Sequence, residues 1–119
     1  MRHPLQALLI APDPLMREAV EDGRKRITLR EGHRDYRPGP VMLCCQIEPW
    51  CVMADIIEVR HCRLCDLTRE ELEADGFIDQ WQMLKQMHRF YPDLDWDSPV
   101  TIVRWENVRG KLVDERQAK

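Results

Sequence analysis

The chain has 119 residues, the usual size of one domain, which leaves no room for two hydrophobic cores of ordinary size. Its 18 Lys and Arg against 21 Asp and Glu give a net charge of −3, which excludes bulk attraction to a polyanion, so any contact with nucleic acid must be local. Apolar residues at 44% and charged residues at 33%, without long blocks of like charge, exclude a disordered chain. We expect one globular domain over residues 1–110 and a polar tail over 111–119.

The N-terminal segment shows no targeting signal. Its apolar stretch at residues 8–11 is interrupted by Pro12, far short of a membrane span or a signal-peptide core. We therefore expect a cytoplasmic protein without membrane attachment. The five cysteines are an odd number, and Cys44 and Cys45 are adjacent in an apolar run, so we expect reduced thiols and no disulfide scaffold.

The first predicted elements are a helix and a strand. Asp13 and Pro14 are typical of an N-cap and a first helical residue, and Gly23 of a helix end, so a helix is predicted over 14–22. Alternation around residues 27–29 then predicts a half-buried strand. Its polar face would contain Arg26, Thr28 and Arg30.

A loop over residues 32–40, containing two Gly and two Pro, separates this strand from the next. The apolar run 41–47 and the run 50–59, rich in β-formers, are predicted to pair as a hairpin across residues 48–49. The last strand is predicted over 100–105.

Two helices are predicted between the hairpin and the last strand. Thr68 and Glu71 form a capping box, so the first helix begins at Thr68 and ends at Gly76. Apolar residues recurring every three or four positions predict a second helix that stops before Pro92. This stripe consists of Ile78, Trp81, Leu84, Met87 and Tyr91. We expect an α+β fold, a small antiparallel β-barrel with inserted helices.

The charges are segregated along the chain. Residues 66–97 contain nine acidic and three basic side chains, whereas residues 24–37 contain six basic and two acidic ones. Arg and Lys pair with phosphate oxygens, so the basic segment is a candidate for phosphate contacts. The alternative is a solvated face neutralised by the acidic helices. The basic residues are Arg24, Lys25, Arg26, Arg30, Arg34 and Arg37.

Two further sets of residues have competing interpretations. His61, Cys62 and Cys65 are zinc-ligand types, but a lone CxxC without a second ligand pair favours free thiols, so no metal and no cofactor is expected. Tryptophans stack on bases in single-stranded nucleic-acid binders. We expect Trp81 and Trp105 in the core. The candidates for ligand stacking are Trp50 and Tyr36, with core packing and loop anchoring as the alternatives.

Residues 23–30, Gly-Arg-Lys-Arg-Ile-Thr-Leu-Arg, resemble the G-x-K-x-x-T-x-R signature of the ASCH domain, a member of the PUA-like superfamily. Further similarity follows in the family's order, from about Ala19 to Val108. The supporting segments are residues 37–39, 67–68, 75–77 and 91–92. The chain is most similar to the small bacterial ASCH proteins that hydrolyse N4-acetylcytidine.

The resemblance implies a PUA-like barrel with a cleft between barrel and helices that binds RNA, a nucleotide or a modified nucleoside. The catalytic Lys, Thr and Glu of the amidohydrolase subgroup match Lys25, Thr28 and, by alignment on Gly76–Phe77, Asp75. Other carboxylates of the insertion are Glu70, Glu71 and Glu73. The expected ligand-binding residues are Arg24, Arg26, Arg30, Arg34, Tyr36, Arg37 and Trp50.

One geometric condition applies to a joint role of Lys25 and Thr28. In a continuous strand the two side chains would point to opposite faces, so Lys25 must lie in the turn after Gly23 and the strand must begin near Arg26 or Ile27. A threonine hydroxyl also needs a base, and a lysine acts as one only when its pKa is lowered.

Three functions are therefore compared. The first is binding of RNA, a nucleotide or a nucleoside by a monomer. The second is an amidohydrolase that removes the acyl group from N4-acylated cytidine. The third is a protein-interaction module that presents the acidic helices to a basic partner.

Overall fold

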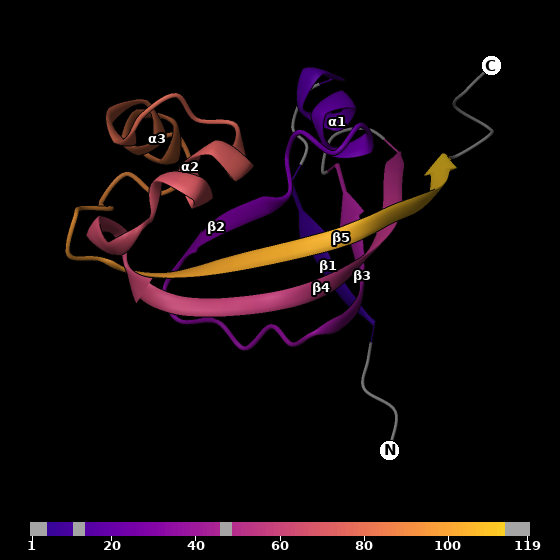
Figure 1. The fold of residues 1–119 in the computed structure, drawn as a ribbon, viewed down its shortest axis with the longest axis horizontal. Coiled ribbons are helices and arrows are strands. Elements are labelled where there is room, and N and C mark those ends of the chain that lie inside the picture. The colour runs from indigo at the N-terminus through magenta and orange to yellow at the C-terminus, as the bar shows by residue number, and fades with distance from the viewer. Residues whose placement is uncertain (1–4, 11–13, 46–48, 114–119) are drawn as a thin grey trace.

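A computed structural model of the chain describes residues 5–10, 14–45 and 49–113 (Figure 1). Its strands are β1 (Gln6–Leu9), β2 (Ile27–Glu31), β3 (Gly39–Cys44), β4 (Trp50–Arg63) and β5 (Pro99–Val113). Its helices are α1 (Pro14–Glu21), α2 (Arg69–Asp75) and α3 (Gln80–Met87), with a short 3₁₀ helix at Leu64–Asp66. The predicted N-cap Asp13, the turn residue Glu48 and tail residues 114–119 lie outside the described residues.

The strands form one curled sheet in the order β1-β3-β4-β5-β2. β1 and β3 are parallel, and every other pair is antiparallel, so the sheet is mixed where an antiparallel barrel was expected. The apolar stretch that forms β1 was not predicted to be a strand. A parallel pair needs a long crossover, and α1 with β2 provides it.

The curl of the sheet brings its two edge strands together. Arg30 of β2 donates a hydrogen bond through Nη2 to the carbonyl oxygen of Leu9 at the end of β1, at 2.7 Å. Figure 1 shows β4 and β5 as long strands that run side by side and bend along the molecule. Register shifts within their pairing, one of them between Ile56 and Glu58, allow this bend. The result is an α+β half-barrel, the small-barrel class that was expected.

Buried side chains form two clusters, one on each face of the sheet. Alternate residues of β5 show this, because Val103 and Trp105 belong to one cluster and Val100 and Ile102 to the other. The inner cluster also includes Leu8, Val20, Val41, Leu43, Val52, Ala54 and Ile56. The outer cluster includes Ile27, Leu29, Leu64, Ala74, Met83, Met87 and Leu94.

Burial on both faces changes the interpretation of β2. Ile27 and Leu29 pack into the outer cluster under the helices, while Thr28 on the other face is only 7% exposed. The alternation in this segment had predicted a strand with one solvated face, and that part of the prediction is wrong. The sheet curls around the inner face of β2, and the curl depends on residues far away in the sequence.

The start and end of α2 are those predicted from the sequence. Thr68 accepts a hydrogen bond from Glu71 N, Glu71 Oε1 accepts one from Thr68 N, and Gly76 ends the helix in the left-handed region at φ 90°. Arg60 of β4 donates two hydrogen bonds to the Glu71 carboxylate, at 2.9 and 2.7 Å. Burial raises the pKa of Glu71, but the bonds from Arg60 and Thr68 outweigh it, so the pKa lies below its usual value.

The buried side of α3 differs from the predicted stripe. Met83 and Met87 face the outer cluster, but Ile78 is 85% exposed and Trp81 is 65% exposed. The placement of Trp81 in the core was therefore wrong. The helix begins only after the N-cap Asp79, so Ile78 precedes it, and eight residues present only a narrow face to the core.

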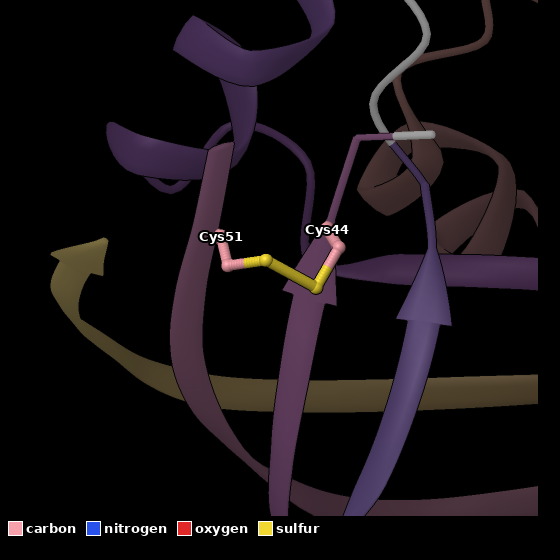
Figure 2. Close-up of a disulfide and its surroundings, with 2 residues drawn as sticks. All are labelled: Cys44 and Cys51. Atoms are coloured by element: carbon pink, nitrogen blue, oxygen red, sulfur yellow. A yellow bond between two sulfur atoms is a disulfide. The ribbon is translucent and has the colours of Figure 1, made fainter. Parts of the chain in front are cut away.

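Cys44 and Cys51 form a disulfide across β3 and β4 (Figure 2). The expectation of reduced thiols was wrong for this pair, because the hairpin register places the two residues directly opposite each other. Cys45, Cys62 and Cys65 are free thiols. None of the described helices is long and apolar enough to cross a membrane.

Thiol mapping tests this cysteine assignment. Alkylation of the unfolded but unreduced protein should label Cys45, Cys62 and Cys65 and leave Cys44 and Cys51 in a linked peptide, as read by peptide mass spectrometry. In the native protein the exposed Cys65 should react before Cys62, because burial raises the pKa of the Cys62 thiol. Labelling of Cys44 and Cys51 without prior reduction would contradict the disulfide.

The Glu71 contacts predict a dependence of stability on pH. Because the folded pKa of Glu71 is below its ordinary value of 4.5, its stabilisation is complete above that value and is lost as the pH falls through the folded pKa. Glu71→Gln should lower the free energy of unfolding by about 2 kcal/mol at neutral pH, since hydrogen bonds to charged groups have this magnitude.

Urea unfolding at neutral and acidic pH measures this difference. The difference in the free energy of unfolding between wild type and Glu71→Gln should become smaller at acidic pH. The exposed control Glu73→Gln should have the same free energy of unfolding as wild type at both pH values. A gap that stays constant with pH would contradict the assignment.

Candidate functional site

The turn between α1 and β2 positions Lys25. Gly23, at φ 84°, adopts a backbone conformation that favours glycine, and Lys25 N donates to the carbonyl of Ala19 at 3.0 Å. β2 begins at Ile27. Lys25 therefore lies in the turn before the strand, which satisfies the geometric condition for acting together with Thr28.

Lys25 forms a buried ion pair with Asp75, the last residue of α2. Lys25 Nζ donates to Asp75 Oδ1, and the side chains are 7% and 4% exposed. A backbone hydrogen bond from Arg26 N to the carbonyl of Ala74, at 2.8 Å, fixes the end of α2 against the turn. An aspartate, although one methylene shorter than a glutamate, thus reaches the lysine because the backbones are held together beside it.

Burial dominates the electrostatics of this pair. It raises the pKa of Asp75 above its usual value, although the charges of Lys25 and Arg30 act in the opposite direction. A carboxylate with a raised pKa accepts a proton more readily than a carboxylate in water.

Thr28 and Arg30 follow on the inner face of β2. They lie opposite Val103 and Thr101 of β5. The hydrogen bonds of the described residues join Lys25 to Asp75 and do not include the Thr28 hydroxyl.

Two buried donors complete this inner face. Arg30 Nε and Trp105 Nε1 have no hydrogen-bond partner among the described residues. Trp105 lies on the same face of β5 as Val103, opposite β2. Buried donors are rarely left unpaired, so these two atoms are candidates for contact with a ligand acceptor. Trp105 was predicted as core from the sequence, and it is core. Its unpaired nitrogen depends on its neighbours, and no sequence signal marks it.

The other carboxylates of the insertion have different partners. Glu71 is held by Arg60 and Thr68, Glu70 pairs with Arg104 at 2.6 Å, and Glu73 lies 3.7 Å from Arg69. Among the alternatives left by the sequence, Asp75 is thus the one beside Lys25. Arg60, which no motif identified, keeps Glu71 away from this position.

The outer arginines of the motif segment are exposed and are not joined to the pair. Arg24 pairs with Asp22 at 2.8 Å, Arg37 with Asp35 at 3.3 Å, and Arg34 Nε donates to the carbonyl of Glu31. Arg26 is exposed as well. Among the described contacts, none connects these four guanidinium groups to Lys25, Thr28 or Asp75. Three of the four therefore already have an acceptor within the protein.

The two aromatic candidates are placed as packing residues. Trp50 is 5% exposed in the inner cluster, and its Nε1 donates to Glu21 Oε1 at 2.7 Å. Tyr36 is partly buried against the same cluster, which is the loop-anchor arrangement. In addition, His61 stacks on His33 at 4.9 Å between ring centres and contacts the Arg34 carbonyl, so the loop after β2 is fastened to β4.

Metal ligation has no support in the part of the chain that the structure describes. There, no three or more His, Cys, Asp or Glu side chains gather as a metal site would require. Cys62 and Cys65 are free thiols, and the Cys65 sulfur lies 3.8 Å from Asp66 Oδ1.

No protein-family model and no curated protein matches the chain. Solved structures do match it. The ASCH domain of Lactobacillus crispatus JV V101 superimposes with a TM-score of 0.62 at 13% identity, over 86% of this chain and 78% of that one. ASCH from Zymomonas mobilis gives 0.64 at 10% identity, over 94% and 73%.

A third similar structure is a DUF984 protein of Enterococcus faecalis V583, with a TM-score of 0.65 at 16% identity over 100% of this chain and 83% of that one. At such low identities the likeness concerns the fold and not the ligand or the reaction. The curled mixed sheet with helices inserted before its last strand agrees with the motif at residues 23–30. The chain therefore has the fold of an ASCH domain.

Proposed function

We propose that the chain binds a nucleoside or nucleotide, free or at the end of a short RNA, at the site formed by Lys25, Asp75, Thr28 and Arg30. The observation that carries the proposal is a pair of buried donors, Arg30 Nε and Trp105 Nε1, that have no partner among the described residues and share the inner face of the sheet with Thr28. Arg30 is also close enough to the buried ion pair to lower the pKa of Asp75.

The chemistry of these groups matches the edge of a pyrimidine base. Lys25, Arg30 and Trp105 donate, Asp75 accepts, and the Thr28 hydroxyl does both. The exocyclic amino group of cytosine donates hydrogen bonds to carboxylates in other nucleic-acid complexes. Acceptor atoms of the same base lie beside it and could receive hydrogen bonds from Lys25, Arg30 and Trp105. The Asp75 carboxylate disfavours an anionic group of the ligand next to the Lys25–Asp75 pair. The phosphate of a nucleotide would therefore lie toward the exposed arginines.

Charge limits the size of the ligand. Six of the 18 basic side chains lie on residues 24–37, and the acidic segment 66–97 would repel a long polyanion. This favours a single nucleoside, a nucleotide or a short RNA end over a duplex.

Thr28→Val tests the binding proposal. The change keeps the shape of a buried side chain whose hydroxyl makes no bond in the described part of the chain, so the fold should persist. Affinity for cytidine and cytidine monophosphate, measured by calorimetry, should fall about tenfold, as expected for one lost hydrogen bond to a ligand. The remote charge control Lys85→Ala should bind like wild type. No binding by wild type, or equal affinity of Thr28→Val, would contradict the proposal.

Our second candidate function for the same site is that of an amidohydrolase for N4-acylated cytidine. The specific observation in its favour is that Lys25, which lies three residues before Thr28 in the sequence, contacts Asp75 Oδ1 through Nζ. In this reaction Lys25 first passes a proton to Asp75, Thr28 Oγ1 attacks the acyl carbonyl, and the hydroxyl proton passes to the Lys25 amine. The C–N4 bond then breaks, the amine of cytidine takes the proton from Lys25, and water later releases the acid from Thr28.

Turnover of N4-acetylcytidine distinguishes the two functions. An enzyme should release cytidine and acetate in equal amounts, lose this activity in Thr28→Val, and keep part of it in Thr28→Ser, which retains a hydroxyl. Chromatography of the products, beside an active amidohydrolase, measures it. Binding of N4-acetylcytidine without release of cytidine would exclude this substrate and leave the binding function in place.

A further inference from the structure

The start of α3 exposes large apolar side chains. Ile78 is 85% exposed and Trp81 is 65% exposed, while the core-facing side of the helix is already filled by Met83 and Met87. Single exposed apolar residues are common on protein surfaces. Two of them three residues apart, one of them a tryptophan, are a feature of binding surfaces, where aromatic side chains contribute much of the affinity.

The exposed tryptophan is held in place. Its ring meets that of Trp96 edge to face, at 5.5 Å between centres and 90° between planes. Trp96 packs against the outer cluster, and its carbonyl accepts a hydrogen bond from Cys65 N at 2.9 Å. Because Trp81 is already oriented in the free protein, its side chain loses little conformational freedom when a partner covers it.

The backbone around Ile78 is also fixed. Ile78 N donates to Gln82 Oε1 at 2.6 Å, and Gln82 N donates to the Asp79 carboxylate at 2.8 Å. Ile78, Trp81 and Trp96, which we call the α3 platform, are thus presented by a capped helix start and a packed loop. Figure 1 shows α3 on the outside of the fold, next to α2.

Carboxylates flank the platform. Asp79 lies between Ile78 and Trp81 in the sequence, and Asp95 and Asp97 are the neighbours of Trp96. Asp97 lies 3.7 Å from Arg63, but no cation pairs with Asp79 or Asp95 among the described ion pairs. By contrast, Glu71 and Asp75 are buried in ion pairs with Arg60 and Lys25, so they contribute little to the electrostatic field at the protein surface. Lys85 lies one helical turn after Trp81, but Asp79 and Asp95, which have no described cation, leave the surroundings of the platform acidic on balance and attractive to cations.

We propose that the α3 platform docks a Lys- or Arg-rich segment of another polypeptide. An apolar side chain of that segment covers Ile78 and Trp81, and a cationic side chain lies against the Trp rings and the flanking carboxylates. A nucleic acid or an anionic membrane is repelled by the same carboxylates. The platform belongs to α3 and the loop before β5, whereas the ligand site is built on β2 and the end of α2, so this proposal does not depend on the function of that site.

A synthetic peptide in which Lys alternates with Leu is the probe, with a Glu–Leu peptide of equal length as its control. Fluorescence anisotropy should show binding of the Lys–Leu peptide to wild type, and weakening by added salt. Trp81→Ser and Ile78→Ser should each weaken binding about tenfold, the usual cost of truncating an anchor residue. The matched control is Leu15→Ser, which removes an apolar side chain of 77% exposure on α1.

The outcomes separate the possible occupants. Equal affinity of wild type and both platform variants for the Lys–Leu peptide would overturn the proposal, as would equal binding of the Glu–Leu peptide. A wild-type dimer in analytical ultracentrifugation that Trp81→Ser converts to a monomer would also overturn it, because a second copy would then cover the platform. Thermal unfolding of Ile78→Ser, whose side chain is almost fully exposed, provides the check that lost binding is not lost folding.

Discussion

The buried ion pair between Lys25 and Asp75 determines how the helical insertion meets the barrel. Two ions taken out of water cost several kcal/mol each, and only close contact with additional fixing of the backbone compensates that cost. The bond from Arg26 N to the Ala74 carbonyl and the left-handed Gly76 supply this fixing. Removing either charge would leave the other buried alone, so the turn before β2 and the end of α2 depend on each other. The groups that form the site are thus also groups that maintain the fold.

The net charge of −3 has a different meaning once the contacts are known. Part of the acidic excess of the insertion is internal, because Glu71 is neutralised by Arg60 and Asp75 by Lys25, and Glu70 meets Arg104 on the surface. Within residues 66–97, the carboxylates without a described cation are those of Asp79, Asp93 and Asp95, near α3. Exposed arginines lie on the segment of the motif and also at Arg63, Arg69, Arg89 and Arg109. The clearest local excess of cations is on residues 24–37, which contain six basic and two acidic side chains.

The features predicted correctly from the sequence are those that depend on nearby residues. The cap at Thr68, the end at Gly76 and the turn that places Lys25 before β2 are all set within a few positions. The features missed depend on long-range pairing. Cys44 meets Cys51 only in the observed hairpin register, and the short β1 is recognisable only once β3 lies beside it. Trp81 matched a helical apolar stripe, but periodicity does not tell how wide a face of a short helix is covered.

Within the site, the raised pKa of Asp75 links binding to chemistry. The proposed acyl transfer requires Lys25 to pass a proton to Asp75 before it takes the proton of the Thr28 hydroxyl, and the raised pKa of Asp75 favours that first transfer. The proposed ligand would exclude water from the pair and so strengthen the effect of burial on Asp75. It would also supply acceptors to Arg30 Nε and Trp105 Nε1, which lack them among the described residues. In the proposed functions, binding and acyl transfer are therefore two stages at one arrangement of residues, and the transfer of a proton from Lys25 to Asp75 would decide whether the second follows the first.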